Sequence, residues 1–209
     1  RDAHAAGIAT VHQELLLFPE LTVAENIFLG QTPKTGAGLI DWTAMRTRAR
    51  ELLNSLDSHD LDIDQKVASL SVGNRQRIEI ARALAQDARV LIMDEPTAAL
   101  AEADVQRLMA IVRNLCARGV AIIYVSHRMP EIFALANRVT VLRDGQHVGT
   151  KPVSEVDEAK LVSMMVGRSI DRLYPAKQGT DGDVILELKN VSHNRVVKNV
   201  SLKLRRGEI

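Results

Sequence analysis

The chain has 209 residues, of which 46% are apolar and 25% are charged, as in an ordinary globular protein of one or two domains. Its formal net charge of +1 gives no electrostatic case for a nucleic-acid partner, and an aromatic content of 3% leaves few platforms for stacked bases. No apolar run approaches the ~20 residues that span a bilayer. The single cysteine, Cys116, excludes an internal disulfide and a cysteine-rich metal site.

Apolar spacing, capping residues and turn formers predict an alternation of helices and strands. Cys116 falls on the apolar stripe of one of these helices, so we expect it in the core. We also expect a helical subdomain over about residues 15–88. In chain order, the predicted elements are a strand over 7–12, a short helix capped by Thr22 and Glu25, helices over about 43–56 and 74–86, a strand over 90–94, a helix over about 102–117, a strand over 120–125, a helix from Pro130 to 136, a hairpin of 138–143 with 146–150, a helix over 154–166 capped within 154–157, and strands over 184–190 and 196–204.

The predicted strand over 90–94 is an apolar run that leads directly into two acids, Asp94 and Glu95. An apolar run without polar alternation is typical of a strand that is buried on both faces in a parallel sheet. Ligands of open α/β sheets bind at the carboxyl ends of the strands, so these carboxylates are candidates for a nucleotide or metal site. The alternative is a strand that ends in two solvated acids.

Three further features also lie at the end of a predicted strand or at the start of a predicted helix. Gln13 follows the first predicted strand, Ser71 and Gly73 open a predicted helix, and His127 follows the strand over 120–125. Taken singly, each of these features is more often structural than functional. Their fixed order along the chain is what makes the combination informative.

Together these motifs resemble those of the ATP-binding cassette (ABC) ATPases. Residues 70–76, Leu-Ser-Val-Gly-Asn-Arg-Gln, resemble the signature motif of that family, and Val-His-Gln-Glu at 11–14 resembles its Q-loop. Residues 90–95 resemble its Walker B motif, and Ser-His-Arg at 126–128 resembles its switch histidine. With valine at position 72, the signature motif resembles that of one branch of the family, the bacterial monosaccharide importers with two fused cassettes.

The resemblance implies an α/β fold, a P-loop NTPase (ABC ATPase) core with a helical subdomain. It implies that Asp94 holds Mg²⁺ directly or through water and that Glu95 polarises the attacking water. His127 would contact the terminal phosphate of ATP, and Gln13 would reach both the metal and the water. Glu95 and His127 are thus the expected catalytic residues, and Asp94 and Gln13 the expected metal ligands and ATP contacts.

The signature residues have a separate expected role. A helix N-terminus with free N–H groups binds phosphate, Gly73 allows close approach of the backbone, and the Ser71 hydroxyl can donate. In the family, one ATP lies between two cassettes, and the signature of one cassette faces the phosphate loop of the other. Ser71 and Gly73 are therefore expected to bind a different ATP from the one that Glu95 and His127 act on.

The sequence also departs from the family pattern. Ala101 stands where the family usually has Asp, and Val72 and Asn74 stand where Gly and Gln are commoner. No G-x-x-x-x-G-K-[ST] motif occurs in the 209 residues. We therefore expect a chain that is truncated before the Walker A strand and is inactive alone.

The expected domain organisation has three parts. Residues 1–166 correspond to the C-terminal two-thirds of a first cassette, residues 167–183 to a linker, and residues 184–209 to the first strands of a second cassette. The start at Arg1 rather than at methionine agrees with a chain whose beginning is not included.

The resemblance implies an ATPase subunit of a bacterial sugar importer. Its partners would be membrane permease subunits and, indirectly, a soluble sugar-binding protein, at the cytoplasmic face of the plasma membrane. The alternative is a soluble fused ABC ATPase of translation or DNA repair. That class tends to carry a long charged linker, a coiled-coil insertion or zinc-binding cysteines, and none of these occurs here. A sheet that lacks a strand would also expose an unpaired edge, so self-association is a further expectation.

Overall fold

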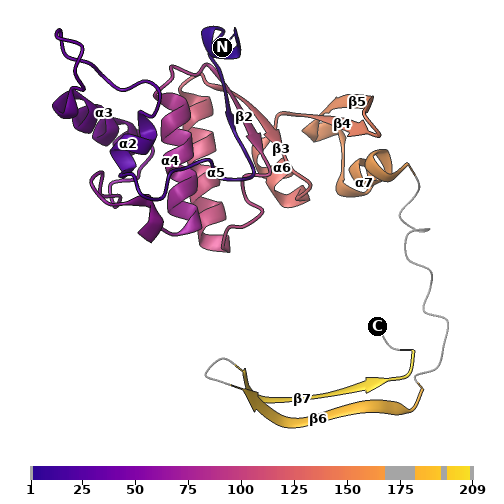
Figure 1. Ribbon diagram of the computed structural model, residues 1–209. Coiled ribbons are helices and arrows are strands. Elements are labelled where there is room, and N and C mark those ends of the chain that lie inside the picture. The colour runs from indigo at the N-terminus through magenta and orange to yellow at the C-terminus, as the bar shows by residue number, and fades with distance from the viewer. Residues whose placement is uncertain (1, 168–181, 194–196, 208–209) are drawn as a thin grey trace. The chain divides into compact units, whose positions relative to one another are not determined.

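The computed structural model describes residues 2–167, 182–193 and 197–207 (Figure 1). The chain divides into two compact units. The first consists of Arg1–Thr140 with Thr150–Val156, and the second of Val141–Gly149 with Asp157–Ile209. Among the described residues, no helix is both long and apolar enough to cross a membrane.

A three-stranded parallel sheet lies at the centre of the first unit. Its strands are β1 (Ile8–Val11), β2 (Val90–Asp94) and β3 (Ala121–Val125), in the order β1-β2-β3. The three strand predictions are confirmed. Leu91 and Met93 of β2 are fully buried, whereas the intervening Val90 and Ile92 are partly exposed, so the prediction of burial on both faces was wrong for one face.

The outer strand β3 has a different environment from β2. Every residue of β3 is apolar or Tyr, yet Ile123 and Val125 are about half exposed. In the described part of the chain, β3 pairs only with β2, so β3 has an open edge in addition to this exposed apolar face.

Helices α2 (Val23–Ile27), α3 (Trp42–Ser55) and α4 (Val72–Leu84) pack against one another. The predicted capping box begins α2, because the Glu25 N–H donates to the Thr22 hydroxyl and the Glu25 carboxylate accepts from the Thr22 N–H at 2.8 Å. Hydrogen bonds from the Thr22 N–H and from the Thr22 hydroxyl lower the pKa of the Glu25 carboxyl. Helix α4 also contacts β1, so it links the helical part to the sheet.

Helix α5 (Glu102–Ala117) has the predicted bounds and lies beside α4 (Figure 1). Its buried side chains form a continuous stripe: Val105, Leu108, Met109, Ile111, Val112 and Leu115. Cys116 is exposed, and its assignment to the core was wrong. Leu115, one residue earlier, occupies the buried position. Consecutive side chains of a helix point in different directions, so Cys116 faces solvent.

The remaining elements follow largely as predicted. The hairpin of β4 (Arg138–Arg143) and β5 (Gln146–Pro152) turns at Asp144 and Gly145, both with positive φ. Helix α7 begins at the end of the predicted capping region, because a 3₁₀ turn occupies Val153–Glu155 and Asp157 is the N-cap. Two short elements were not predicted: α1 (Asp2–Ala5) and a 3₁₀ turn at Val67–Ser69. The remaining elements were predicted and are α6 (Met129–Leu135), α7 (Glu158–Val166), β6 (Val184–His193) and β7 (Val197–Arg205).

Strands β6 and β7 form an antiparallel pair, in agreement with the two predicted C-terminal strands. Most of the predicted linker, residues 168–181, lies outside the described residues.

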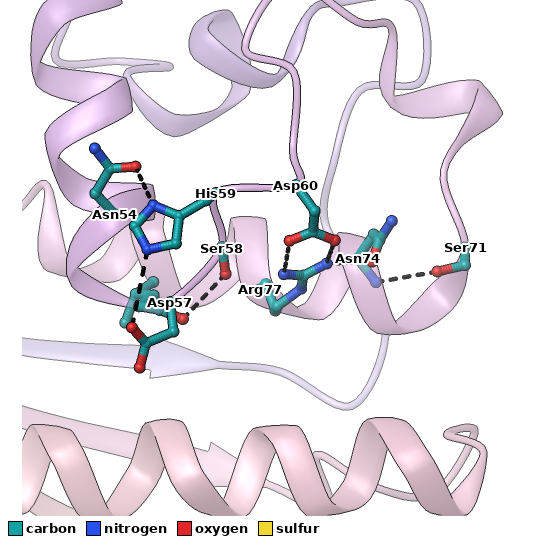
Figure 2. Close-up of polar contacts among 9 residues, drawn as sticks. Asn54, Asp57, Ser58, His59, Asp60, Ser71, Asn74 and Arg77 are labelled. Atoms are coloured by element: carbon teal, nitrogen blue, oxygen red, sulfur yellow. Dashed lines mark hydrogen bonds and ion pairs between the residues drawn. The ribbon is translucent and has the colours of Figure 1, made fainter.

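A polar network fastens the start of α4 to the loop that follows α3 (Figure 2). The Asp60 carboxylate accepts two hydrogen bonds from Arg77, at 2.7 and 2.8 Å. Arg77 also donates to the Asn74 side chain at 2.6 Å, and the Asn74 N–H donates to the Ser71 hydroxyl at 3.3 Å. The Arg77 side chain is nearly buried, so this fork satisfies a guanidinium that would otherwise be costly to bury.

The network predicts a pH-dependent stability term. Hydrogen bonds from Arg77 lower the pKa of Asp60 to about 2. The contribution of the ionised carboxylate is therefore fully present above about pH 4 and is lost as the pH falls through about 2. We expect Asp60→Asn to lower the free energy of unfolding at pH 7 by about 1 kcal/mol, because Asp60 is more than half exposed and solvent screens the pair.

Denaturant unfolding of both chains at several pH values measures this effect. The stability difference should narrow as the pH falls from about 4 toward 2. Glu51→Gln, at an exposed carboxylate of α3 without an ion pair among the described residues, is the matched control. A difference that is unchanged down to pH 2, or equal for both variants, would contradict the assignment.

The start of α5 predicts a stabilising substitution. Ala101 is the N-cap, with the extended backbone of a capping residue, but it offers no side-chain acceptor to the free N–H groups. We expect Ala101→Ser to raise the free energy of unfolding by about 1 kcal/mol in denaturant titrations. The control is Ala99→Ser, two residues earlier in the exposed turn, which should change the free energy of unfolding by less than about half as much. Equal effects of the two substitutions would show that capping is not the cause.

Candidate functional site

The carboxyl ends of the three parallel strands bring Gln13, Glu95 and His127 together. The strands are in register, with Val11 beside Met93 and Asp94 beside Val125, so the residues that follow them emerge at one edge of the sheet. Nδ1 of His127 lies 3.0 Å from Oε1 of Glu95, and Nε2 of Gln13 lies 3.5 Å from Oε2. One carboxylate thus receives polar groups from the ends of both neighbouring strands.

The backbone of Glu95 is held in an unusual conformation. Its φ of 43° lies in the left-handed region, which costs a non-glycine residue about 1–2 kcal/mol. The Glu95 N–H donates to the carbonyl of Val125 at 2.9 Å, so the pairing of β2 with β3 continues into the residue and sustains the strained turn. Strained backbone of this kind is common at functional sites.

Asp94 is the last residue of β2 and is exposed. Among the described residues it has no hydrogen bond or ion pair, so its carboxylate oxygens are available as ligands. No group of three or more His, Cys, Asp or Glu side chains that could hold a metal lies in the described part of the chain. Mg²⁺ beside phosphate needs only one or two protein oxygens, and the Asp94 carboxylate and the Gln13 side-chain amide are oxygen donors of the kind that it prefers.

A cavity of about 290 Å³ adjoins Glu95 and His127. Of the residues that line the cavity, only these two were predicted from the sequence. The others lie close in the chain to Glu95 or His127, and this proximity was the one signal that could have identified them. The complete lining is Glu95, Thr97, Ala98, Leu100, Ser126, His127 and Arg128.

Ser71 and Gly73 lie at the start of α4. The Ser71 hydroxyl is the N-cap acceptor, and Gly73 is buried in the first turn. A Cβ at Gly73 would overlap the carboxylate of Asp104 on α5, so packing between the two helices requires glycine here. No hydrogen bond or ion pair within the described ranges joins Ser71 or Gly73 to Glu95 or His127.

The loop after β1 is also tied to α4. Nη1 of Arg82 donates to the carbonyl of Leu16 at 2.8 Å, and Arg82 lies 3.8 Å from the buried Glu79 carboxylate. Burial raises the pKa of Glu79, against the opposing effect of Arg82. The loop that follows Gln13 is thereby connected to the helix that begins at Ser71.

Two curated relatives match the chain along nearly its whole length. The ribose import ATP-binding protein RbsA 3 of Rubrobacter xylanophilus is 49% identical over 207 residues, which are 99% of this chain and 41% of that protein. The ribose import ATP-binding protein RbsA of Chromobacterium violaceum is 47% identical over the same shares of both chains. The chain thus spans about two-fifths of the length of these relatives.

The fold agrees with these sequence matches. A solved structure of the ATP-binding cassette MJ0796, a dimer in a post-hydrolysis state with ADP and Pi, superposes with a TM-score of 0.59 at 27% identity, covering 70% of this chain and 62% of that one. Residues 1–98 match the sequence profile described as ABC transporter. The fold is that of an ABC ATPase cassette with a P-loop NTPase core, and the chain is similar in sequence to ATP-binding proteins of ABC transporters.

Proposed function

We propose that this chain is part of the ATP-binding subunit of an ABC importer, which couples ATP hydrolysis to the uptake of a monosaccharide. The meeting of Gln13, Glu95 and His127 at one sheet edge carries the proposal, because a carboxylate, an imidazole and an amide are the groups that position and activate water beside a phosphate. The ribose import proteins matched along the whole chain support a sugar as cargo.

Glu95 is the proposed general base. Its carboxylate accepts a proton from water as the water attacks the terminal phosphate, and the His127 contact at 3.0 Å fixes the direction of that carboxylate. His127 is exposed enough to reach the phosphate as well. Asp94 and Gln13 would hold Mg²⁺, whose charge draws electron density from the phosphate oxygens when it is bound.

Ser71 and Gly73 are proposed to bind the ATP of a second cassette. The first turn of α4 offers free N–H groups and the positive end of the helix dipole to a phosphate. The contacts of Asp60 with Arg77 and of Arg77 with Asn74 support this role, because they fix the backbone that carries those N–H groups.

The domain layout belongs to the same proposal. Residues 1–166 would form the larger part of a first cassette, with a helical subdomain over about 15–88, and residues 184–209 the first strands of a second. Permease subunits would bind the helical subdomain at the cytoplasmic face of the membrane, and a sugar-binding protein would act on the permease. The open edge of β3 is the surface at which copies of this chain would associate.

The role of Glu95 predicts the outcome of a single-atom replacement. In the full-length protein, Glu95→Gln should lower turnover at this ATP site by about 10²- to 10⁴-fold, because an amide cannot accept the proton. ATP binding should persist, since the amide keeps the size of the carboxylate. Steady-state phosphate release and equilibrium binding of Mg-ATP measure the two effects. Glu51→Gln on the exposed face of α3 is the control, and full turnover at both sites in Glu95→Gln would rule out Glu95 as the base.

The missing phosphate-loop motif predicts the behaviour of the 209-residue chain by itself. Without G-x-x-x-x-G-K-[ST], most contacts with the triphosphate are absent, so we expect no micromolar affinity for Mg-ATP and no hydrolysis. Calorimetric titration of the chain with Mg-ATP tests this expectation. A dissociation constant in the micromolar range would show that the residues described above suffice to bind the nucleotide.

A further inference from the structure

Glu131 is a buried acid outside the residues assigned above. It lies in the first turn of α6 and is 3% exposed. Its Oε2 accepts hydrogen bonds from Tyr124 at 2.8 Å, Thr97 at 2.9 Å and Ser126 at 3.3 Å. A carboxylate removed from water in this way is stable only where donors replace its hydration, and here three hydroxyl groups do so.

The second carboxylate oxygen of Glu131 has a different partner. Oε1 lies 2.8 Å from Nη1 of Arg128, which compensates the negative charge. The two groups are close but are not aligned as a hydrogen bond, so the charge is balanced while Oε1 lacks a directed donor. Burial and then the neighbouring Glu131 carboxylate raise the pKa of Tyr124, whose hydroxyl therefore remains a donor.

The donors to Glu131 come from the segments that carry the site. Thr97 follows Glu95 by two residues, and Ser126 precedes His127. Thr97, Ser126 and Arg128 are three of the seven residues that line the cavity, so nearly half of its lining is fastened to one carboxylate.

The turn around His127 is closed by the same cluster. The Arg128 N–H donates to the Ser126 hydroxyl at 3.0 Å, and that hydroxyl lies within hydrogen-bonding distance of Glu131. His127 is held between Ser126 and Arg128, both of which contact Glu131. The imidazole is therefore aimed at Glu95 by a backbone that Glu131 anchors.

We propose that Glu131 is a positioning residue for ATP hydrolysis, which locks the segments after β2 and β3 together so that His127 and Glu95 keep their mutual geometry. The inference rests on the proposed function and extends it to a residue that touches neither the phosphate nor the metal. A displacement of about 1 Å at a catalytic group can cost about 10²-fold in rate, so the effect of losing this anchor is measurable.

The test uses the full-length protein and four chains: wild type, Glu131→Gln, His127→Ala and the double variant. Glu131→Gln keeps the size of the side chain but loses the charge that Arg128 balances. We expect kcat to fall about 10- to 100-fold while KM for ATP changes less than about threefold. In the His127→Ala background the same change should cost less than about twofold, because Glu131 acts through His127.

A stability control separates positioning from general weakening of the fold. Ile111→Val removes one buried methyl group from α5 without touching the Glu131 cluster and should leave kcat unchanged. Hydrogen exchange measured on peptides that cover residues 126–131 gives a readout independent of activity. Exchange should quicken in Glu131→Gln and stay unchanged in Ile111→Val.

The outcomes distinguish the two proposals. If the wild type does not hydrolyse ATP, the proposed function fails and this inference fails with it. If the wild type is active and Glu131→Gln keeps its kcat, or costs as much with His127 absent as with it present, only the inference fails. Should Glu131→Gln not fold, Thr97→Val and Ser126→Ala each remove one donor and should each lower kcat by about threefold or more; wild-type kcat in both would overturn the inference.

Discussion

The pairing of β2 with β1 and β3 is the constraint on which the candidate site depends. Parallel strands in register deliver the residues that follow them to one edge, and the Glu95 N–H extends this pairing one step beyond β2 to the carbonyl of Val125. That additional bond sustains a left-handed backbone at Glu95. Without it, the side chains of Asp94 and Glu95 would alternate across the sheet, and Glu95 would not face both Gln13 and His127.

The chemistry at this edge is distributed between exposed and buried acids. Asp94 and Glu95 are accessible enough to meet a ligand, whereas Glu131 is enclosed by hydroxyl groups and a guanidinium. The buried acid supplies rigidity because its donors come from separate segments, each of which loses a hydrogen bond if it moves. The exposed Asp94, which has no hydrogen bond or ion pair among the described residues, keeps its oxygens for ligands that these residues do not provide.

The bounds of elements that end at a recognisable acidic or turn-forming residue could be predicted closely from the sequence. β2 and α5 have the predicted bounds, since an acid ends the first and a glycine follows the second. The start of α7 could not be predicted, because Ser154 and Asp157 are both good caps and only the folded chain shows that a 3₁₀ turn occupies Val153–Glu155. Cys116 was wrongly assigned to the core because the spacing of apolar residues along a helix does not show where its buried face ends.

The candidate site shows the same division. Gln13, Glu95 and His127 could be predicted because each lies within two residues of the end of a strand that is recognisable from its apolar residues. Glu131 could not, because its meaning depends on three hydroxyl groups at positions 97, 124 and 126, whose convergence is a property of the tertiary fold. The close approach of Asp104 to Gly73 is likewise a contact between helices that no local pattern encodes.

That approach has a mechanical consequence. Because Gly73 has no Cβ, the Asp104 carboxylate in the first turn of α5 packs directly against the backbone of α4, and little room remains for either helix start to move toward the other. Asp104 lies three residues after Ala101, where the turn that begins at Glu95 enters α5. The amino ends of α4 and α5 are therefore in contact through the short side chain of Asp104, so a displacement of one helix start is passed to the segment that leads back to the strained Glu95.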